Sequence, residues 1–259
     1  MAQLFRHAES WRALGGNERR YDYVISGISQ PSTGGNALTT QAQRSDLAAE
    51  VVAAAEHLFA AGVMSHAGHA NLSGRLGADR FVLTTTGMVR DLRRDQLATV
   101  DLLGRVLEGA LGPENAEIVA MHSVVYKTRP EVGGVIHTHS PAATAFALAH
   151  RPLPCRAEPL LRFGQAEPVP IVPWGPRGSD RSVRGIAEVL EANPTTAAVL
   201  LANHGLVAFG TDPLAAARLV VAIEEAAEAE LSAAAIGGAA DFPEGALDAV
   251  RASMARAHP

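Results

Sequence analysis

The sequence predicts an α/β fold in which helices cover a largely antiparallel sheet. Short apolar runs bounded by glycine turns predict strands, and several follow one another closely enough to form hairpins. Longer segments between them repeat their apolar residues at helical spacing. Hairpins pair strands antiparallel, and an amphipathic helix buries its apolar side on a sheet. The mixture of the two therefore predicts helices packed on an antiparallel sheet.

Composition divides the chain into three parts. Residues 1–42 are rich in Gly, Ser, Thr, Gln and Arg and have no sustained period, which predicts a partly ordered N-terminal extension. A regular pattern begins abruptly after it and predicts one domain over residues 43–240, followed by a C-terminal tail over residues 241–259. The chain of 259 residues is long enough for such a domain to bury a substantial core.

Local patterns predict the elements of this domain in order. Ser45 and Asp46 are expected to cap a first helix that Gly62 ends. The elements after it follow from the period of the apolar residues and from the glycines and prolines between them. They are strands over 70–76 and 80–87, a hairpin over 98–109, a helix over 117–128, a strand over 135–139, a short helix over 141–149, a proline-rich extended segment over 151–176, a helix over 177–192, strands over 197–202 and 207–210, and a long helix over 213–235.

Composition also excludes several classes of function. The formal net charge of -5 leaves no basic field to attract nucleic acid or anionic membranes. No apolar run reaches the roughly 20 residues of a membrane span, and the N-terminus has no basic segment followed by an apolar one. We therefore expect a cytoplasmic protein without a membrane partner. Cys155 is the only cysteine, which excludes an internal disulfide and a thiolate metal cluster.

Three histidines have the spacing of a metal site. His137 and His139 end an apolar run, and alternate residues of a strand point to one face, so both imidazoles can bind one ion. His204 follows a second apolar run and can supply a third nitrogen. A single histidine near a strand is more often structural, but packing does not account for this combination. Three neutral imidazoles leave a coordination position open, which is typical of a catalytic metal.

Glu117 is the candidate acid/base. It lies upstream on the helix expected to face the histidine strand, where a carboxylate can move a proton beside the ion or fill its open position. The alternative is a solvated residue in the first helical turn, where negative charge is favourable. Glu114 competes for the same role, and His122 on this helix is expected to face the core.

Two segments are candidates for binding an anionic substrate. Residues 65–73 and the turn over 84–87 offer small side chains and backbone amides, which suit an anion. The alternative is an ordinary glycine turn with local hydroxyl hydrogen bonds. The substrate-binding candidates are Asn71, Thr86 and Gly87.

Together these residues resemble the class II aldolase/adducin family over roughly residues 46–235. The resemblance implies a three-layer αβα domain with a central mixed, mostly antiparallel sheet. It also implies a homotetramer with active sites between adjacent subunits, and a small-molecule substrate. The most specific similarity lies in residues 121–122, Tyr126, residues 129–130, residues 135–141 and residues 203–205.

The resemblance implies roles for the candidate residues. His137, His139 and His204 would bind a divalent cation, with zinc expected and manganese, cobalt or iron as alternatives. Glu117 would serve as the acid/base, and the ion would polarise a carbonyl so that an enediolate forms. Glu117 lies one residue upstream of the usual spacing, because Ile118 holds the aligned position.

The sequence departs from the family where its members bind phosphate. They typically have a Gly-Thr-x-Gly-Asn loop and a Ser-Ser pair before the helix glutamate. This chain has Ala-Gly-His-Ala-Asn over residues 67–71 and Asn115-Ala116 before Glu117, with Glu114 adding negative charge. A phosphate would lose hydroxyl donors and meet a carboxylate, so we predict a substrate that is not phosphorylated. His69 in the loop can donate to a carboxylate or move a proton.

These expectations favour a metal-dependent carbon-carbon lyase of the aldolase type. The first alternative is a decarboxylase of a hydroxylated aromatic or heteroaromatic (di)carboxylic acid, because both reactions leave a carbanion beside a polarised oxygen. An epimerase shares the metal chemistry, and a non-catalytic member resembling adducin would lack the metal histidines. Arg90, Arg162 and Arg177 are further candidates for binding a carboxylate, and the favoured alternative for each is a surface or interface position.

Overall fold

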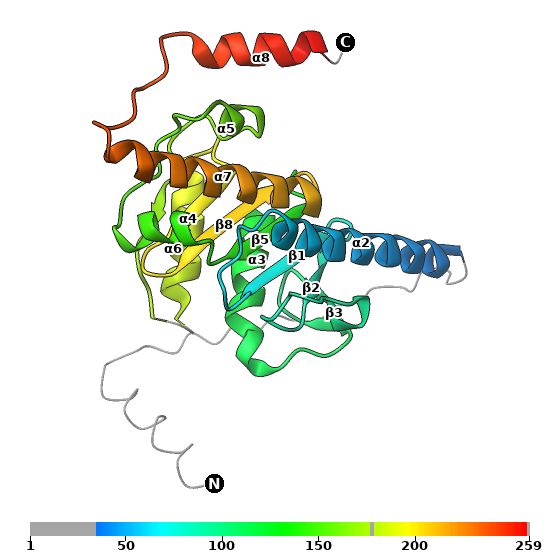
Figure 1. Cartoon of the computed structure of the whole chain (residues 1–259). Helices are drawn as coiled ribbons and strands as arrows, with labels where there is room; N and C mark the ends of the chain where they lie inside the picture. The colour runs from blue at the N-terminus through cyan, green and yellow to red at the C-terminus, as the bar shows by residue number, and fades with distance from the viewer. Residues whose placement is uncertain (1–34, 177–178, 258–259) are drawn as a thin grey trace, which may run out of the picture. The chain divides into compact units, whose positions relative to one another are not determined.

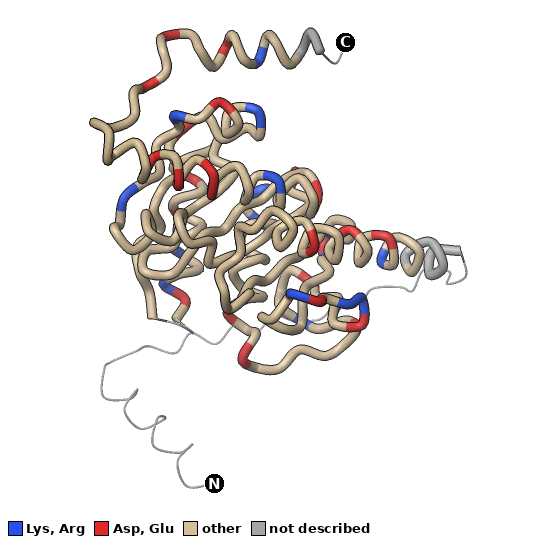
Figure 2. Tube along the Cα trace, in the orientation of Figure 1, with Lys and Arg blue, Asp and Glu red and all other residues tan. Residues whose placement is uncertain are grey.

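The structure is a computed structural model that describes residues 35–176 and 179–257 (Figure 1). Most of the predicted extension over residues 1–42 lies outside the described residues. All strands of the described residues belong to one compact unit, Leu38–Pro259. Basic and acidic side chains are interspersed along its trace (Figure 2). Within the described part of the chain, no helix has both the length and the apolar character needed to cross a bilayer.

The first helix, α2 (Gly35–Ala60), starts ten residues before the predicted cap. Ser45 and Asp46 lie inside it on the exposed side, so the prediction that they cap the helix was wrong. Arg44 supplies the physical reason, because its Nε donates to Thr99 Oγ1 at 3.0 Å and pairs with Glu108 Oε2 at 3.0 Å. These distant contacts hold the helix where its own sequence has no apolar period.

A single eight-stranded sheet runs through the domain in the order β4-β3-β2-β1-β5-β8-β7-β6. Every neighbouring pair is antiparallel except β6 and β7, which are parallel. The mixed, mostly antiparallel sheet is therefore confirmed. The strands are β1 (Ala70–Arg75), β2 (Arg80–Thr84), β3 (Leu97–Asp101), β4 (Val106–Glu108), β5 (Gly134–Thr138), β6 (Ile171–Val172), β7 (Ala198–Leu201) and β8 (Gly205–Gly210).

Helices cover both faces of the sheet and confirm the three-layer αβα architecture (Figure 1). The helices α2, α4 (Pro141–Leu148) and α7 (Pro213–Ala234) pack on one face in a core that includes Ile136. The helices α3 (Ala116–Thr128) and α6 (Asp180–Ala192) pack on the other face with Val135. Because adjacent strand residues point to opposite faces, His137 lies on the face of α3 and α6.

The structure also has elements that the sequence analysis did not predict. The helix α5 (Glu158–Arg162) and strand β6 lie in the segment predicted as extended, residues 151–176. The helix α8 (Ala246–Ala257) lies in the predicted tail, residues 241–259. Elements as short as α5 and β6 have too few residues to establish a period, and β6 depends on its distant partner β7.

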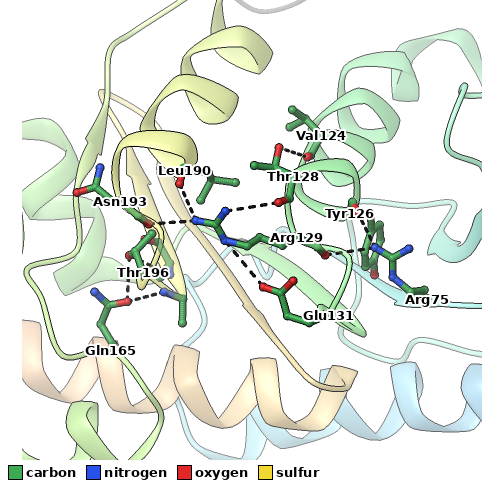
Figure 3. A network of polar contacts seen from close by, with 12 residues as sticks. Arg75, Val124, Tyr126, Thr128, Arg129, Glu131, Gln165, Leu190, Asn193 and Thr196 are labelled. Atoms are coloured by element: carbon green, nitrogen blue, oxygen red, sulfur yellow. Dashed lines mark hydrogen bonds and ion pairs between the residues drawn. The ribbon is translucent and has the colours of Figure 1, made fainter. Parts of the chain in front are cut away.

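Two arginines connect helix α3 to its neighbours α6 and β1 (Figure 3). Arg129, at the end of α3, donates through Nη2 to the carbonyl oxygens of Leu190 at 2.6 Å and Asn193 at 3.1 Å, where α6 ends. Arg75 on β1 donates to the Tyr126 carbonyl oxygen at 2.6 Å, and its guanidinium carbon lies 4.7 Å from the centre of the Tyr126 ring. Arg129 thus ties α3 to α6, and Arg75 ties α3 to β1.

Candidate active site

Three imidazoles meet at the end of the central strand. His137 lies on β5, His139 follows its last residue, and His204 lies in the turn between β7 and β8. Their potential ligand nitrogens are all within 4.8 Å of one another. The ring centres of His137 and His204 are 4.6 Å apart, and those of His139 and His204 are 5.0 Å apart. The structure therefore brings together the three histidines that the sequence proposed as metal ligands.

Strand pairing and a tight turn explain why the third histidine reaches the first two. His137 faces Val207 in the register between β5 and β8. In the turn before β8, Asn203 has a φ of 58°, a left-handed conformation that asparagine tolerates better than most residues. A Cβ at Gly205 would collide with the carbonyl oxygen of Thr138, so only glycine permits this close approach.

The environment disfavours the protonated form of His137 and His139. Burial first, and then the neighbouring His204 and His139, hold the pKa of His137 well below its usual value. Burial also lowers the pKa of His139, with His204 and His69 adding to the effect. The Nδ1 of His137 donates to the Leu206 carbonyl oxygen at 2.9 Å, which leaves the Nε2 lone pair directed at the cluster.

These three residues fit a divalent ion by their donor chemistry. The Nε2 atoms of His137 and His139 face each other at 3.1 Å. With Nδ1 of His137 carrying the proton, its Nε2 has only a lone pair to present. Tetrahedral zinc with bonds of about 2.0–2.1 Å separates its ligand nitrogens by about 3.3 Å, close to the observed spacing. The spacing of this pair therefore fits a shared divalent ion, which His137, His139 and His204 would hold.

A cavity of about 430 Å³ opens beside the imidazoles. Except for the three arginines proposed as carboxylate binders, the residues that the sequence proposed for metal binding, catalysis and substrate binding line it. They are joined by Glu114 and Asn115, and by the apolar side chains of Ile118, Met121, Ile186 and Leu201. The proposed residues in the wall are His69, Asn71, Thr86, Gly87, Glu117, His137, His139 and His204.

Glu117 and His69 approach the cluster from different elements. Glu117 lies in the first turn of α3, and Ser182 Oγ on α6 donates to its Oε1 at 3.4 Å. His69 is exposed and precedes β1, and a Cβ added to Gly87 would lie 3.2 Å from its Nδ1. Because Gly87 has no side chain, the imidazole of His69 can rest against the turn. Both residues border the same space as the three imidazoles.

Some residues that line the cavity were not predicted from the sequence, and three arginines that were predicted to bind substrate are not among its described lining residues. Ser182 and Ile186 line the cavity from α6, but they are distant in sequence and carry no signal of this role. Arg90 stacks at 4.6 Å on the Phe59 ring, Arg162 pairs with Glu158, and Arg177 lies outside the described residues. Among the described residues that line the cavity, none is Arg or Lys.

His122 is fully buried, as the sequence analysis expected for a core residue. Its ring nevertheless hydrogen bonds to Asn71, a residue of the cavity wall. Sequence reasoning did not find this contact, because the two residues are 51 positions apart.

Comparison with known proteins identifies the class. Residues 49–231 match the family model described as Class II Aldolase and Adducin N-terminal domain, and the chain belongs to this family. The solved structure of an L-fuculose 1-phosphate aldolase superposes with a TM-score of 0.70 over 81% of this chain and 96% of that chain, at 23% identity. This similarity shows that the two proteins share their fold.

Two curated relatives are more similar in sequence. A 3-oxo-tetronate 4-phosphate decarboxylase from Haemophilus influenzae is 34% identical over 62% of this chain and 76% of its own length. A methylthioribulose-1-phosphate dehydratase from Pseudomonas savastanoi pv. phaseolicola is 31% identical over 74% of this chain and 98% of its own length. Decarboxylases, dehydratases and aldolases are all lyases, so the chain belongs to an enzyme family of lyase chemistry.

Proposed function

We propose that this protein is a divalent-metal-dependent lyase that cleaves a carbon-carbon bond in a small carbonyl or carboxylate substrate by aldolase-type chemistry. The observation that carries the proposal is the cluster of three imidazoles at the wall of an open cavity. Three nitrogen ligands leave room for substrate at the ion, unlike a closed structural site. Zinc is the expected ion, and manganese, cobalt and iron are alternatives that the same donors accept.

When bound, the ion acts as a Lewis acid toward a substrate oxygen. The other roles belong to side chains of this chain. Glu117 holds the proton that is exchanged with the reacting carbon, which its place in the cavity wall beside the imidazoles supports. Asn71, Thr86 and Gly87 bind the substrate, and His69 donates to a carboxylate or moves a proton at the exposed rim.

We further propose that the substrate carries no phosphate. The relatives are named for phosphorylated substrates, so this proposal rests on the local departure from them. Glu114 and Glu117 line the cavity, and the described lining has no arginine or lysine to offset a phosphate dianion. A substrate with hydroxyl or carboxylate groups needs less compensating charge than a phosphate does.

Decarboxylation is the second candidate. One relative is named as a decarboxylase, and the cavity combines His69 at its rim with apolar side chains such as Met121 and Ile186. Such a wall suits a hydroxylated aromatic or heteroaromatic (di)carboxylic acid, whose ring packs on apolar groups while its carboxylate takes a donor. Retro-aldol cleavage and decarboxylation both leave an electron pair on carbon, so one scaffold serves either reaction.

Elemental analysis combined with a product screen tests the proposal. We expect about one divalent ion per chain, and pyruvate release from hydroxy-keto acids without phosphate. Carbon dioxide without pyruvate would identify the decarboxylase instead. His139→Ala is expected to lose both the ion and turnover, whereas His57→Ala, which removes a histidine from α2, keeps both. Absence of metal after reconstitution with zinc or manganese would overturn the catalytic proposal.

A further inference from the structure

A buried chain of hydrogen bonds leads from α3 to the cavity wall. The Tyr126 hydroxyl lies 2.8 Å from Ser73 Oγ, which lies 2.6 Å from His122 Nδ1. On the other side of the same ring, His122 Nε2 lies 2.6 Å from Asn71 Oδ1. Tyr126, Ser73 and His122 are at most 1% exposed, and Asn71 is 6% exposed. Water therefore has little access to these bonds, and each must be satisfied within the chain.

The proton of the Tyr126 hydroxyl determines which group donates in each of these hydrogen bonds. Burial raises the pKa of Tyr126 far above its usual value, so the phenol keeps its proton. Its described neighbours are the Ser73 hydroxyl and the backbone N–H of Val135, which is itself a donor. Tyr126 can therefore donate only to Ser73 among them. Ser73 accepts that bond, and its own hydroxyl therefore donates a hydrogen bond to Nδ1 of His122.

The protonation of the His122 ring then determines how the Asn71 amide is oriented. Burial lowers the pKa of His122 to about 3, so the ring is neutral and carries one proton. Because Nδ1 accepts from Ser73, the proton lies on Nε2 and is donated to Asn71. The oxygen of the Asn71 amide must then face the ring, and the opposite side of the amide presents its two N–H groups.

Those N–H groups lie beside the metal ligands. Asn71 on β1 is the register partner of His137 on β5, so the two side chains are cross-strand neighbours on one face. Asn71 lines the cavity. Reversal of the amide would place an oxygen at this point, which would repel an anionic substrate oxygen instead of donating to it.

We propose that Tyr126, Ser73 and His122 are positioning residues, which fix the Asn71 amide so that its N–H groups donate to a substrate oxyanion or carboxylate beside His137 and His139. The role of Asn71 toward substrate rests on the proposed lyase function. The orientation itself does not, because it follows from the buried hydrogen bonds alone. A fixed donor is worth more than a mobile one, since no reorganisation is needed when charge develops.

Two conservative substitutions separate positioning from packing. In His122→Gln the terminal amide can occupy the place of Nε2 and still donate to Asn71. In His122→Asn the shorter amide can occupy the place of Nδ1 and keeps only the bond to Ser73. We expect His122→Asn to lower kcat at least tenfold with little change in metal content, whereas His122→Gln stays within about threefold of the parent enzyme. Equal losses in the two variants, following their melting temperatures, would indicate a packing role and overturn the proposal.

The tautomer of His122 provides a readout that needs no activity. Nitrogen-15 NMR of the full chain should show a neutral ring protonated at Nε2, and Ser73→Ala should lose this fixed tautomer. A ring protonated at Nδ1 in the parent protein would overturn the proposal outright. If the Nε2 tautomer is found but the protein has no lyase activity, the orientation stands and the proposed function fails.

Discussion

His150 and Asn203 are joined by a hydrogen bond of 2.6 Å between His150 Nε2 and Asn203 Oδ1. Both residues adopt left-handed backbone conformations, with φ values of 53° and 58°. Asn203 immediately precedes His204, and its backbone N–H also donates to the Ala147 carbonyl oxygen at 3.1 Å. The end of α4 therefore holds the turn that carries the third imidazole.

Asn203 should be replaceable by glycine more readily than by alanine. Asn203→Ala puts a residue without asparagine's short polar side chain into a left-handed conformation that costs most residues about 1–2 kcal/mol, and it also removes the bond to His150. Asn203→Gly removes the bond but keeps the backbone unstrained. Chemical denaturation should rank the alanine variant as less stable, and its zinc affinity should fall further. Equal stability of the two variants would contradict a role for the backbone conformation.

Zinc should stabilise the folded protein. An ion present at 100 times its dissociation constant adds about 2.7 kcal/mol if it binds only the folded state. A thermal melt with and without zinc measures this shift after the protein has been stripped with a chelator. His139→Ala should show almost no shift, and an unchanged shift in that variant would move the ion to another site.

His122 should make stability depend on pH. Its folded pKa of about 3 lies below the unfolded value, so the unfolded chain binds the proton first as the pH falls. The stabilisation is complete above about pH 6.5 and decreases toward the folded pKa by about 1.4 kcal/mol per pH unit. Denaturation of the metal-free protein at several pH values, compared with His122→Gln, should reveal this difference in slope. Parallel profiles would show that His122 does not titrate as described.

Arg129 should matter for stability more than an exposed arginine does. Arg129→Met removes the hydrogen bonds to the Leu190 and Asn193 carbonyl oxygens, and bonds from a charged donor contribute about 1.5–3 kcal/mol each. Arg94→Met, at an exposed position, should change the unfolding free energy by no more than about 0.5 kcal/mol. Denaturant titration of both variants measures the difference, and equal effects would exclude the proposed tie between α3 and α6.

Glu114 should disfavour phosphate at the cavity. Glu114→Ser removes a carboxylate from the wall and adds a hydroxyl donor. We expect the variant to bind inorganic phosphate at least about tenfold more tightly than the parent protein, as about 1.4 kcal/mol of removed repulsion implies. Calorimetric titration with phosphate is the measurement. Glu114→Gln serves as the control for charge alone, and unchanged binding in both variants would remove the electrostatic argument.

The sequence predicted the sheet and the meeting of the three histidines because both depend largely on local patterns. Strand alternation places His137 and His139 together, and hairpin spacing predicts antiparallel pairing. Contacts between distant residues were not predictable in the same way. The start of α2 depends on the contacts of Arg44 with β3 and β4. Helix α6 brings Ser182 to the cavity, although Ser182 is distant in sequence from the three histidines.

The buried network around His122 shows the same limit. Its partners Asn71 and Ser73 are 51 and 49 residues away, so a single sequence offers only a histidine on an apolar helix face. The homotetramer, the cytoplasmic location and the identity of the ion remain predictions from the sequence.

If His137, His139 and His204 bind a metal ion as proposed, the pairing of β5 with β8 determines when that site can form during folding. His137 and His139 are two residues apart in sequence, so they can approach one another without distant strand pairing. The third nitrogen arrives only after β8 has paired with β5, across the 69 residues that separate His137 from Leu206. Closing so long a loop precedes full coordination, so tight binding marks a late stage of folding. A pulse of metal during refolding would thus report when the central strands have joined.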